Sequence, residues 1–115
     1  PQGLKAAIES KQGKAILVDY YADWCVACQH MEHKVFVQPL IQAQLEQFQR
    51  LKIDLTESTA GKQAIMKQQH VFGPPSLLFL SPNGDEVREL RITGEISAEE
   101  LSSILSRALQ QPEIL

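Results

Sequence analysis

The sequence predicts an α/β fold with a mixed central sheet of about four main strands and helices on both faces. Two short apolar runs, at residues 15–22 and 76–80, have the length and composition of buried strands. Helical spacing between apolar residues in the intervening segments predicts crossovers that would make part of the sheet parallel. The turn residues Asn83-Gly84 follow the second run and favour a C-terminal hairpin.

The first 48 residues contain one predicted strand and three predicted helices. Apolar residues at helical spacing predict a short first helix over 4–13. The strand at 15–22 follows, and helical periodicity begins again over 25–35. A proline suits the first turn of a helix, so we expect another helix over 39–48.

The second half is predicted to complete the sheet. Apolar and polar residues alternate over 51–56, which indicates the next strand, and a helix capped by Ser58 or Thr59 should end near His70. A hairpin partner is expected at 86–92, after the strand at 76–80. A capping box then opens a last helix over 97–109, beyond which we expect the tail to fray.

Length and charge favour a single small domain spanning 1–115. A chain of 115 residues can bury a sizeable core without disulfides, and its net charge of −3 with no basic run gives no footprint for nucleic acid. No apolar run approaches the length of a membrane span, so we expect a soluble, monomeric domain. Because the chain starts at Pro1 without methionine, we expect a processed product or a fragment of a larger protein.

The two cysteines lie where the first strand gives way to a helix. Cys25 is at the predicted helix start, where unpaired N–H groups and a partial positive charge favour a thiolate. Cys28 lies one turn later on the same face, close enough to attack a mixed disulfide on Cys25. The spacing therefore predicts Cys25 as an accessible nucleophile and Cys28 as a buried resolving thiol.

Two other interpretations of the cysteines are a structural disulfide and a zinc site. Closing so short a loop would constrain the unfolded chain by only about 2 kcal/mol, so a bridge intended for stability would span more residues. Zinc would require Cys25, Cys28, His30 and His33, but four ligands crowded on one helix cannot converge tetrahedrally on one ion. We therefore favour redox chemistry and expect both histidines to be exposed.

The motif Trp24-Cys25-Val26-Ala27-Cys28 after a strand, with Gly-Pro-Pro-Ser at 73–76 before a later strand, resembles the thioredoxin superfamily. More narrowly, residues 19–28 followed by Glu32 resemble the C-terminal periplasmic domain of DsbD-type thiol:disulfide interchange proteins. The resemblance covers about residues 4–109. The sequence departs from ordinary thioredoxin at two places: Val26-Ala27 replaces Gly-Pro, and Gln29 stands where a lysine is usual. These departures argue against a general cytosolic thioredoxin.

This resemblance implies a thioredoxin fold and a protein-disulfide reductase. Electrons would pass by dithiol–disulfide exchange from a membrane-embedded domain to an N-terminal periplasmic domain, feeding disulfide isomerisation and cytochrome c biogenesis. The domain would lie in the periplasm as part of an inner-membrane protein and would need no metal, flavin or nucleotide. The alternatives are a free-standing or tethered thioredoxin-like reductase and a non-catalytic binding module of the same fold.

The resemblance also implies roles for residues outside the cysteine pair. Pro75 should follow a cis peptide bond beside Cys25, where the backbone pairs with an extended partner segment. Four further residues should form the rim of that docking surface. They are Trp24, Val26, Gly73 and Pro74.

Asp19 and Glu32 are the acidic residues that the resemblance places near the sulfurs. Asp19 is a carboxylate within an apolar strand, and its ordinary interpretation is an outward-facing residue on a sheet with one wet face. If both carboxylates lie close to Cys25, Coulomb repulsion opposes a second negative charge there. We then expect Cys25 to remain mostly a thiol at neutral pH, in a coupled set with both acids.

Overall fold

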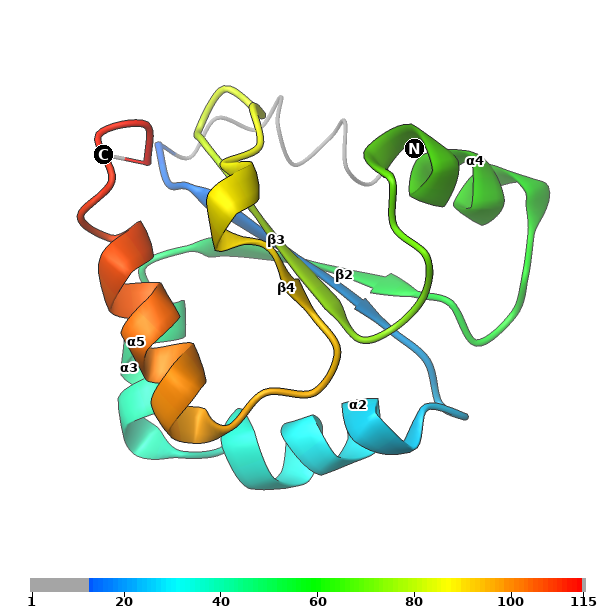
Figure 1. Ribbon diagram of the computed structural model, residues 1–115, viewed down its shortest axis with the longest axis horizontal. Coiled ribbons are helices and arrows are strands. Elements are labelled where there is room, and N and C mark those ends of the chain that lie inside the picture. The colour runs from blue at the N-terminus through cyan, green and yellow to red at the C-terminus, as the bar shows by residue number, and fades with distance from the viewer. Residues whose placement is uncertain (1–12, 115) are drawn as a thin grey trace.

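The computed structural model describes residues 13–114 and shows a four-stranded mixed sheet (Figure 1). The central strand β1 is parallel to β2 and antiparallel to β3, which pairs in turn with a short antiparallel β4. The predicted fold class is therefore confirmed. In spatial order the strands are β2 (Gln49–Asp54), β1 (Ile16–Tyr21), β3 (Ser76–Leu80) and β4 (Ile92–Thr93).

Helices cover the sheet on two faces, with α4 on one side and α2, α3 and α5 on the other (Figure 1). Their N-termini follow the sequence signals: Thr59 accepts a hydrogen bond from the Lys62 N–H, and Ser97 accepts one from the Glu100 N–H. The helices are α2 (Val26–His30), α3 (Pro39–Leu45), α4 (Ala60–Gln69) and α5 (Ala98–Ala108).

The helix that carries the cysteines changes character after α2. Residues Met31–Val35 form a π-helical turn, η1, closed by the hydrogen bond from the Phe36 N–H to the Met31 carbonyl at 2.9 Å. Met31 and Val35, the predicted core stripe, are both buried. The sequence predicts a continuous helix here and gives no sign of the π turn.

Strand β1 is buried on both faces because its alternate side chains enter two separate cores. Leu17 packs with Phe79 and Leu105 on the face covered by α3 and α5. Val18 and Tyr20 pack on the opposite face with Ile65 of α4. This burial explains why the strand reads as a continuous apolar run rather than an alternating one.

The predicted hairpin partner at 86–92 is confirmed only at its two ends. Glu86 forms an isolated antiparallel bridge with Leu80, and Ile92 begins β4, which pairs antiparallel with β3. Between them the 3₁₀ turn η2 (Arg88–Leu90) replaces the predicted strand. Val87 and Leu90 are both buried, and a separation of three residues places two side chains on one side of a helical turn, not of a strand.

Two further predictions concern the ends of the chain. The predicted first helix over 4–13 falls almost wholly outside the described residues. The predicted fraying after residue 109 is wrong at Ile114, whose side chain is buried in the core formed by α3 and α5. This apolar contact holds the C-terminal segment against the domain.

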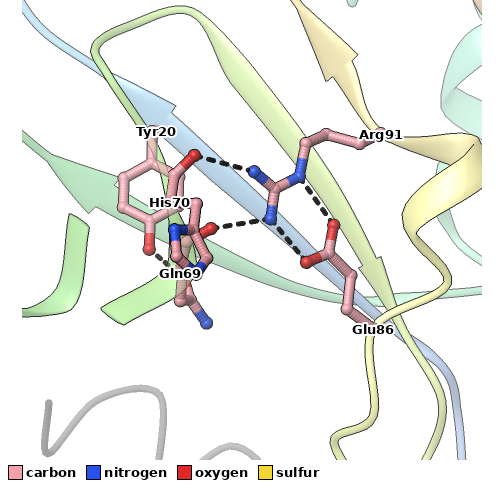
Figure 2. Close-up of polar contacts among 5 residues, drawn as sticks. All are labelled: Tyr20, Gln69, His70, Glu86 and Arg91. Carbon is pink, nitrogen blue, oxygen red and sulfur yellow. Dashed lines mark hydrogen bonds and ion pairs between the residues drawn. The ribbon is translucent and has the colours of Figure 1, made fainter. Parts of the chain in front are cut away.

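Arg91 joins the C-terminus of α4 to the segment before β4 (Figure 2). Its guanidinium donates to both carboxylate oxygens of Glu86, at 2.7 and 2.5 Å. It also donates to the carbonyls of Gln69 and His70, at 2.7 and 2.9 Å, where α4 ends with His70 in the left-handed conformation. Tyr20 of β1 donates to the Gln69 side chain. One cation therefore satisfies helix-end carbonyls that would otherwise lack partners.

We predict that Arg91→Met lowers the free energy of unfolding by about 2 kcal/mol, because it leaves the mostly buried Glu86 carboxylate and two helix-end carbonyls without a donor. Urea unfolding of the oxidised protein measures the effect. The exposed Arg88 offers a matched control, and Arg88→Met should change stability by less than about 0.5 kcal/mol. Equal losses in the two variants would contradict this role of Arg91.

Candidate active site

The two cysteines form a disulfide at the point where β1 leads into α2. Cys25 is the N-cap of α2, in an extended conformation with φ −88° and ψ 105°, and Cys28 lies in its first turn. Their Cα atoms are 5.2 Å apart. The Cys28 N–H donates to the Cys25 sulfur at 3.1 Å, so this sulfur occupies the position of a capping acceptor. The predicted helix start at Cys25 is confirmed.

Exposure does not separate the two sulfurs in this disulfide-bonded state. As whole residues, Cys25 is 7% exposed and Cys28 is 6% exposed. The prediction that the Cys25 sulfur is the more accessible one concerns the reduced protein and stays a prediction. The bridge holds both sulfurs together against the apolar side chains of one core, which covers them equally. What separates them is position, because Cys25 accepts the helix N–H and Cys28 lines a cavity that is open to solvent.

That cavity, of about 210 Å³, adjoins the disulfide on the Cys28 side. The structure brings four of the predicted site residues around it from four different segments: β1, α2, η1 and the loop before β3. They are Asp19, Cys28, Glu32 and Pro75. Cys25 does not line it. The acidic side chains therefore share their space with the second cysteine of the motif rather than with the first.

Asp19 is the buried charge of this cavity. The residue is 4% exposed, which excludes the outward-facing interpretation. Burial raises the pKa of Asp19 to about 6, since water is removed from the ionised form. Lys52 and Arg50 lower this pKa, and Glu32 raises it further. The carboxyl group therefore exchanges its proton close to neutral pH.

Lys52 is a cavity residue that the sequence analysis did not identify. It lies opposite Asp19 in the parallel register between β1 and β2, and its Nζ is 3.7 Å from the Glu32 carboxylate. The same Nζ lies over the Tyr21 ring, 4.7 Å from its centroid. The alternating pattern at 51–56 indicates a polar residue at 52, but the register that places Lys52 beside Asp19 requires the sheet.

The loop before β3 completes the site. The Pro74-Pro75 peptide bond is cis, as predicted. The Gly73 carbonyl accepts a hydrogen bond from the Ser76 hydroxyl at 2.7 Å, and the Pro75 carbonyl accepts one from the Gly94 N–H at 2.9 Å. Pro75 thereby faces the cavity beside the disulfide.

Trp24 is held beside the disulfide by the segment after β2. Its indole Nε1 donates to the Thr56 carbonyl at 3.2 Å, and the Asp23 N–H donates to the Thr56 hydroxyl at 2.8 Å. Asp54 in turn accepts from the Thr56 N–H at 2.9 Å. Sequence reasoning did not assign Thr56 this role, because the contacts join segments that are distant in the chain.

The predicted docking rim contains exposed apolar side chains. Trp24 is 62% exposed and Val26 is 83% exposed. Phe72, which the sequence analysis did not identify, is 94% exposed in the loop before Gly73. Its position immediately before Gly-Pro-Pro is the sequence signal that could have identified Phe72 as a residue of this rim.

The histidines do not enter the cavity lining. His30 and His33 are both exposed, as predicted, and His30 contacts the Glu95 carboxylate. Among residues 13–114, no group of three or more histidine, cysteine or acidic side chains has an arrangement that could hold a metal ion. None of the helices in the described chain has the length and apolar character needed to cross a membrane.

Comparison with known proteins agrees with this fold. The family described as thioredoxin-like domain matches residues 3–109, so the chain belongs to that family. Among solved structures, it is similar to the reduced C-terminal domain of DsbD from Neisseria meningitidis. The TM-score is 0.80 at 25% identity, covering 92% of this chain and 94% of that one. A Thermus thermophilus thioredoxin gives a TM-score of 0.75, also at 25% identity, covering 95% of this chain and 82% of that one.

Curated relatives at higher identity are thiol:disulfide interchange proteins. The chain is 43% identical over 110 residues to DsbD 1 of Pseudomonas aeruginosa, covering 94% of this chain and 19% of that protein. It is 40% identical over 104 residues to DsbD of Haemophilus ducreyi, covering 90% of this chain and 18% of that protein. The chain thus spans about a fifth of the length of these two relatives.

We predict that Asp19→Asn stabilises the oxidised protein by about 2–3 kcal/mol near pH 8. The folded-state pKa of about 6 lies above the unfolded value, so ionisation of Asp19 costs folding free energy as pH rises through that interval. The gain should therefore shrink to nearly nothing by about pH 3, where the carboxyl is protonated in both the folded and the unfolded wild type. Urea unfolding across this pH range measures it.

The exposed Asp85 supplies the control, and Asp85→Asn should give no comparable pH-dependent gain. A stability difference between Asp19→Asn and wild type that stays constant with pH would contradict the buried, raised-pKa description of Asp19.

Proposed function

We propose that this chain is a thiol:disulfide oxidoreductase domain that reduces disulfides in partner proteins. The observation that carries the proposal is the Cys25–Cys28 disulfide at a helix N-cap, beside a cavity that holds a buried carboxyl group and Pro75. The similarity to thiol:disulfide interchange proteins supports the same chemistry.

In the reduced domain, the Cys25 thiolate attacks one sulfur of a partner disulfide and expels the other sulfur as a thiolate. The Cys28 thiol then loses its proton and attacks the Cys25 sulfur, which forms the Cys25–Cys28 bridge and releases the second partner sulfur as a thiolate. Two electrons pass to the partner, and the domain is oxidised. The two partner thiolates take up two protons, which balance the proton lost by Cys28 and the proton lost to solvent when Cys25 ionised. The N–H of Cys28 donates to the Cys25 sulfur and favours its anionic form as the nucleophile.

Asp19 is the proposed proton acceptor for the second step. Cys28 must be deprotonated before it attacks, and Asp19 lines the same cavity. A pKa of about 6 leaves the carboxyl largely ionised at neutral pH, yet basic enough to take a proton transiently. Because Asp19 shares this cavity with Cys28, we propose that it accepts a proton from Cys28 in addition to tuning Cys25, the role predicted from sequence.

Asp19 and Glu32 are also proposed to restrain Cys25. Two carboxylates in a confined space oppose a nearby thiolate, and Glu32 already raises the pKa of Asp19. Lys52, 3.7 Å from Glu32, reduces this effect without removing it, because that ion pair is nearly half exposed. Cys25 would then react mainly when a docked partner changes its surroundings.

The proposed setting is a relay in the periplasm, within an inner-membrane protein. A membrane-embedded domain would reduce Cys25–Cys28, and the domain would pass the electrons to an N-terminal periplasmic domain. The support is similarity to DsbD proteins about five times the length of this chain. The second candidate is a free-standing or tethered thioredoxin-like reductase, favoured by the structural similarity to thioredoxin.

Turnover with insulin distinguishes an oxidoreductase from a non-catalytic binding module. We expect the chain to reduce insulin disulfides catalytically in the presence of excess dithiothreitol. A rate of insulin reduction no greater than that of dithiothreitol alone would contradict the proposed activity.

A separate prediction concerns the different roles of the two cysteines, Cys25 as the nucleophile and Cys28 as the resolving thiol. Cys28→Ser should accumulate a mixed disulfide between Cys25 and a partner, because no resolving thiol remains. Cys25→Ser should accumulate at least about tenfold less mixed disulfide. Non-reducing electrophoresis followed by mass spectrometry measures the adducts. Preferential trapping through Cys28 would reverse the assignment.

A further inference from the structure

One short segment, residues 91–95, holds both ends of the cis-proline loop, residues 71–75. Before the loop, the Arg91 guanidinium donates to two backbone carbonyls at the end of α4 (Figure 2). After the loop, β4 pairs with the first two residues of β3. The Gly94 N–H also donates to the Pro75 carbonyl at 2.9 Å. The loop is therefore fixed from both sides by neighbouring residues of a single segment.

The same segment reaches the helix that carries the cysteines. Glu95 contacts the imidazole of His30, which is the last residue of α2 and lies two residues after Cys28. Both side chains are about half exposed, so this contact adds little to the free energy of unfolding. Residues 91–95 nevertheless contact α4, the cis-proline loop and α2 in turn, which relates the position of the loop to that of the disulfide.

Arg91 is the principal anchor at the start of the loop. Its guanidinium makes four hydrogen bonds, two to the Glu86 carboxylate and one each to the carbonyls of Gln69 and His70. The side chains of Arg91 and Glu86 are 13% and 17% exposed, so water and salt screen this ion pair less than a surface pair. At His70 the chain leaves α4 in the left-handed conformation, with φ 56°. Arg91 thus stabilises a turn that a side chain other than glycine adopts at a cost.

The loop itself makes few hydrogen bonds between its ends. Among residues 13–114, no acceptor pairs with the N–H of Phe72 or Gly73, and Pro74 and Pro75 have no N–H to donate. The Gly73 carbonyl accepts from the Ser76 hydroxyl at 2.7 Å, close to the β3 end. The position of the α4 end of the loop therefore depends largely on its anchor.

We propose that Arg91 is a positioning residue for disulfide exchange, because it fixes the cis-proline loop beside the Cys25–Cys28 pair before a partner arrives. This inference rests on the proposed disulfide-reductase function and adds a residue on which that function depends. Arg91 does not line the cavity that Pro75 and Cys28 share, so it acts through the loop. A polypeptide that binds beside a loosened loop must order that loop, which lowers affinity, whereas a small disulfide that meets only the sulfurs need not.

Two disulfides of different size test this role. The reduced domain is mixed with excess insulin or with excess 2-hydroxyethyl disulfide, and its remaining thiols are counted over time by alkylation and mass spectrometry. The ratio of the two second-order rate constants reports positioning, since a general loss of folded protein lowers both rates equally. Hydrogen exchange of the amides of residues 71–73 reports the mobility of the loop directly.

Arg91→Met should lower the rate constant for insulin about tenfold, leave that for the small disulfide within about twofold, and speed hydrogen exchange in the loop. Arg91→Lys should lie between this variant and wild type, because a single ammonium keeps the charge beside Glu86 but cannot replace the four hydrogen bonds of the guanidinium. Should Arg91→Met not fold, Arg91→Lys carries the test.

Two control variants separate positioning from stability. Arg88→Met removes an exposed arginine three residues away and should change neither rate constant. Ile114→Ala removes a buried side chain from the core covered by α3 and α5 and should cost at least as much stability as Arg91→Met. The ratio of the two rate constants should nevertheless stay at the wild-type value in Ile114→Ala.

An Arg91→Met or Arg91→Lys protein with the wild-type ratio would overturn the inference, as would an equal selective loss in Ile114→Ala. Failure of the wild type to reduce insulin is a different result. It would refute the proposed reductase function on which this inference rests.

Discussion

The constraint on which this site depends is a carboxyl group buried in the central strand. Asp19 lies on β1 between two other strands, and the sheet is covered on both faces, so water cannot solvate its charge freely. The consequence is a pKa of about 6. A group with this pKa can accept a proton from Cys28 and still carry charge that discourages ionisation of its neighbours. Its cost to folding is consistent with a functional rather than a stabilising role.

The rest of the fold brings reactive groups to that carboxyl group. The strand order places the end of β1 next to the end of β2 and the start of β3, so Cys28, Lys52 and Pro75 converge on one cavity. The Thr56 carbonyl accepts a hydrogen bond from the indole of Trp24, which precedes Cys25 in the chain. In the proposed function, the cavity lined by Asp19 and Cys28 serves proton transfer, and the exposed side chains of Trp24 and Val26 contact a partner.

Much of this could be predicted from local sequence signals. The apolar run of β1, the helix start at Cys25 and the capping by Ser97 are each encoded within a few neighbouring residues, and the structure confirms them. The segment at 86–92 was mispredicted between its two ends because burial of Val87 and Leu90 outweighed strand propensity. The position of Lys52 beside Asp19 depends on the strand register, and the similar burial of the two cysteines depends on the closed disulfide. Neither feature is encoded in a local sequence pattern.

The central claim is that the buried Asp19 and the more exposed Glu32 tune the reactive cysteine, and alkylation of Cys25 across pH tests it most directly. The rate of Cys25 modification by iodoacetamide would be measured in the reduced wild type, Asp19→Asn and Glu32→Gln, with labelled sites assigned by mass spectrometry. The account predicts that the midpoint moves to lower pH when a carboxylate is removed, and most for Asp19→Asn. If neither substitution lowers the midpoint, the carboxylates are structural and the account is contradicted.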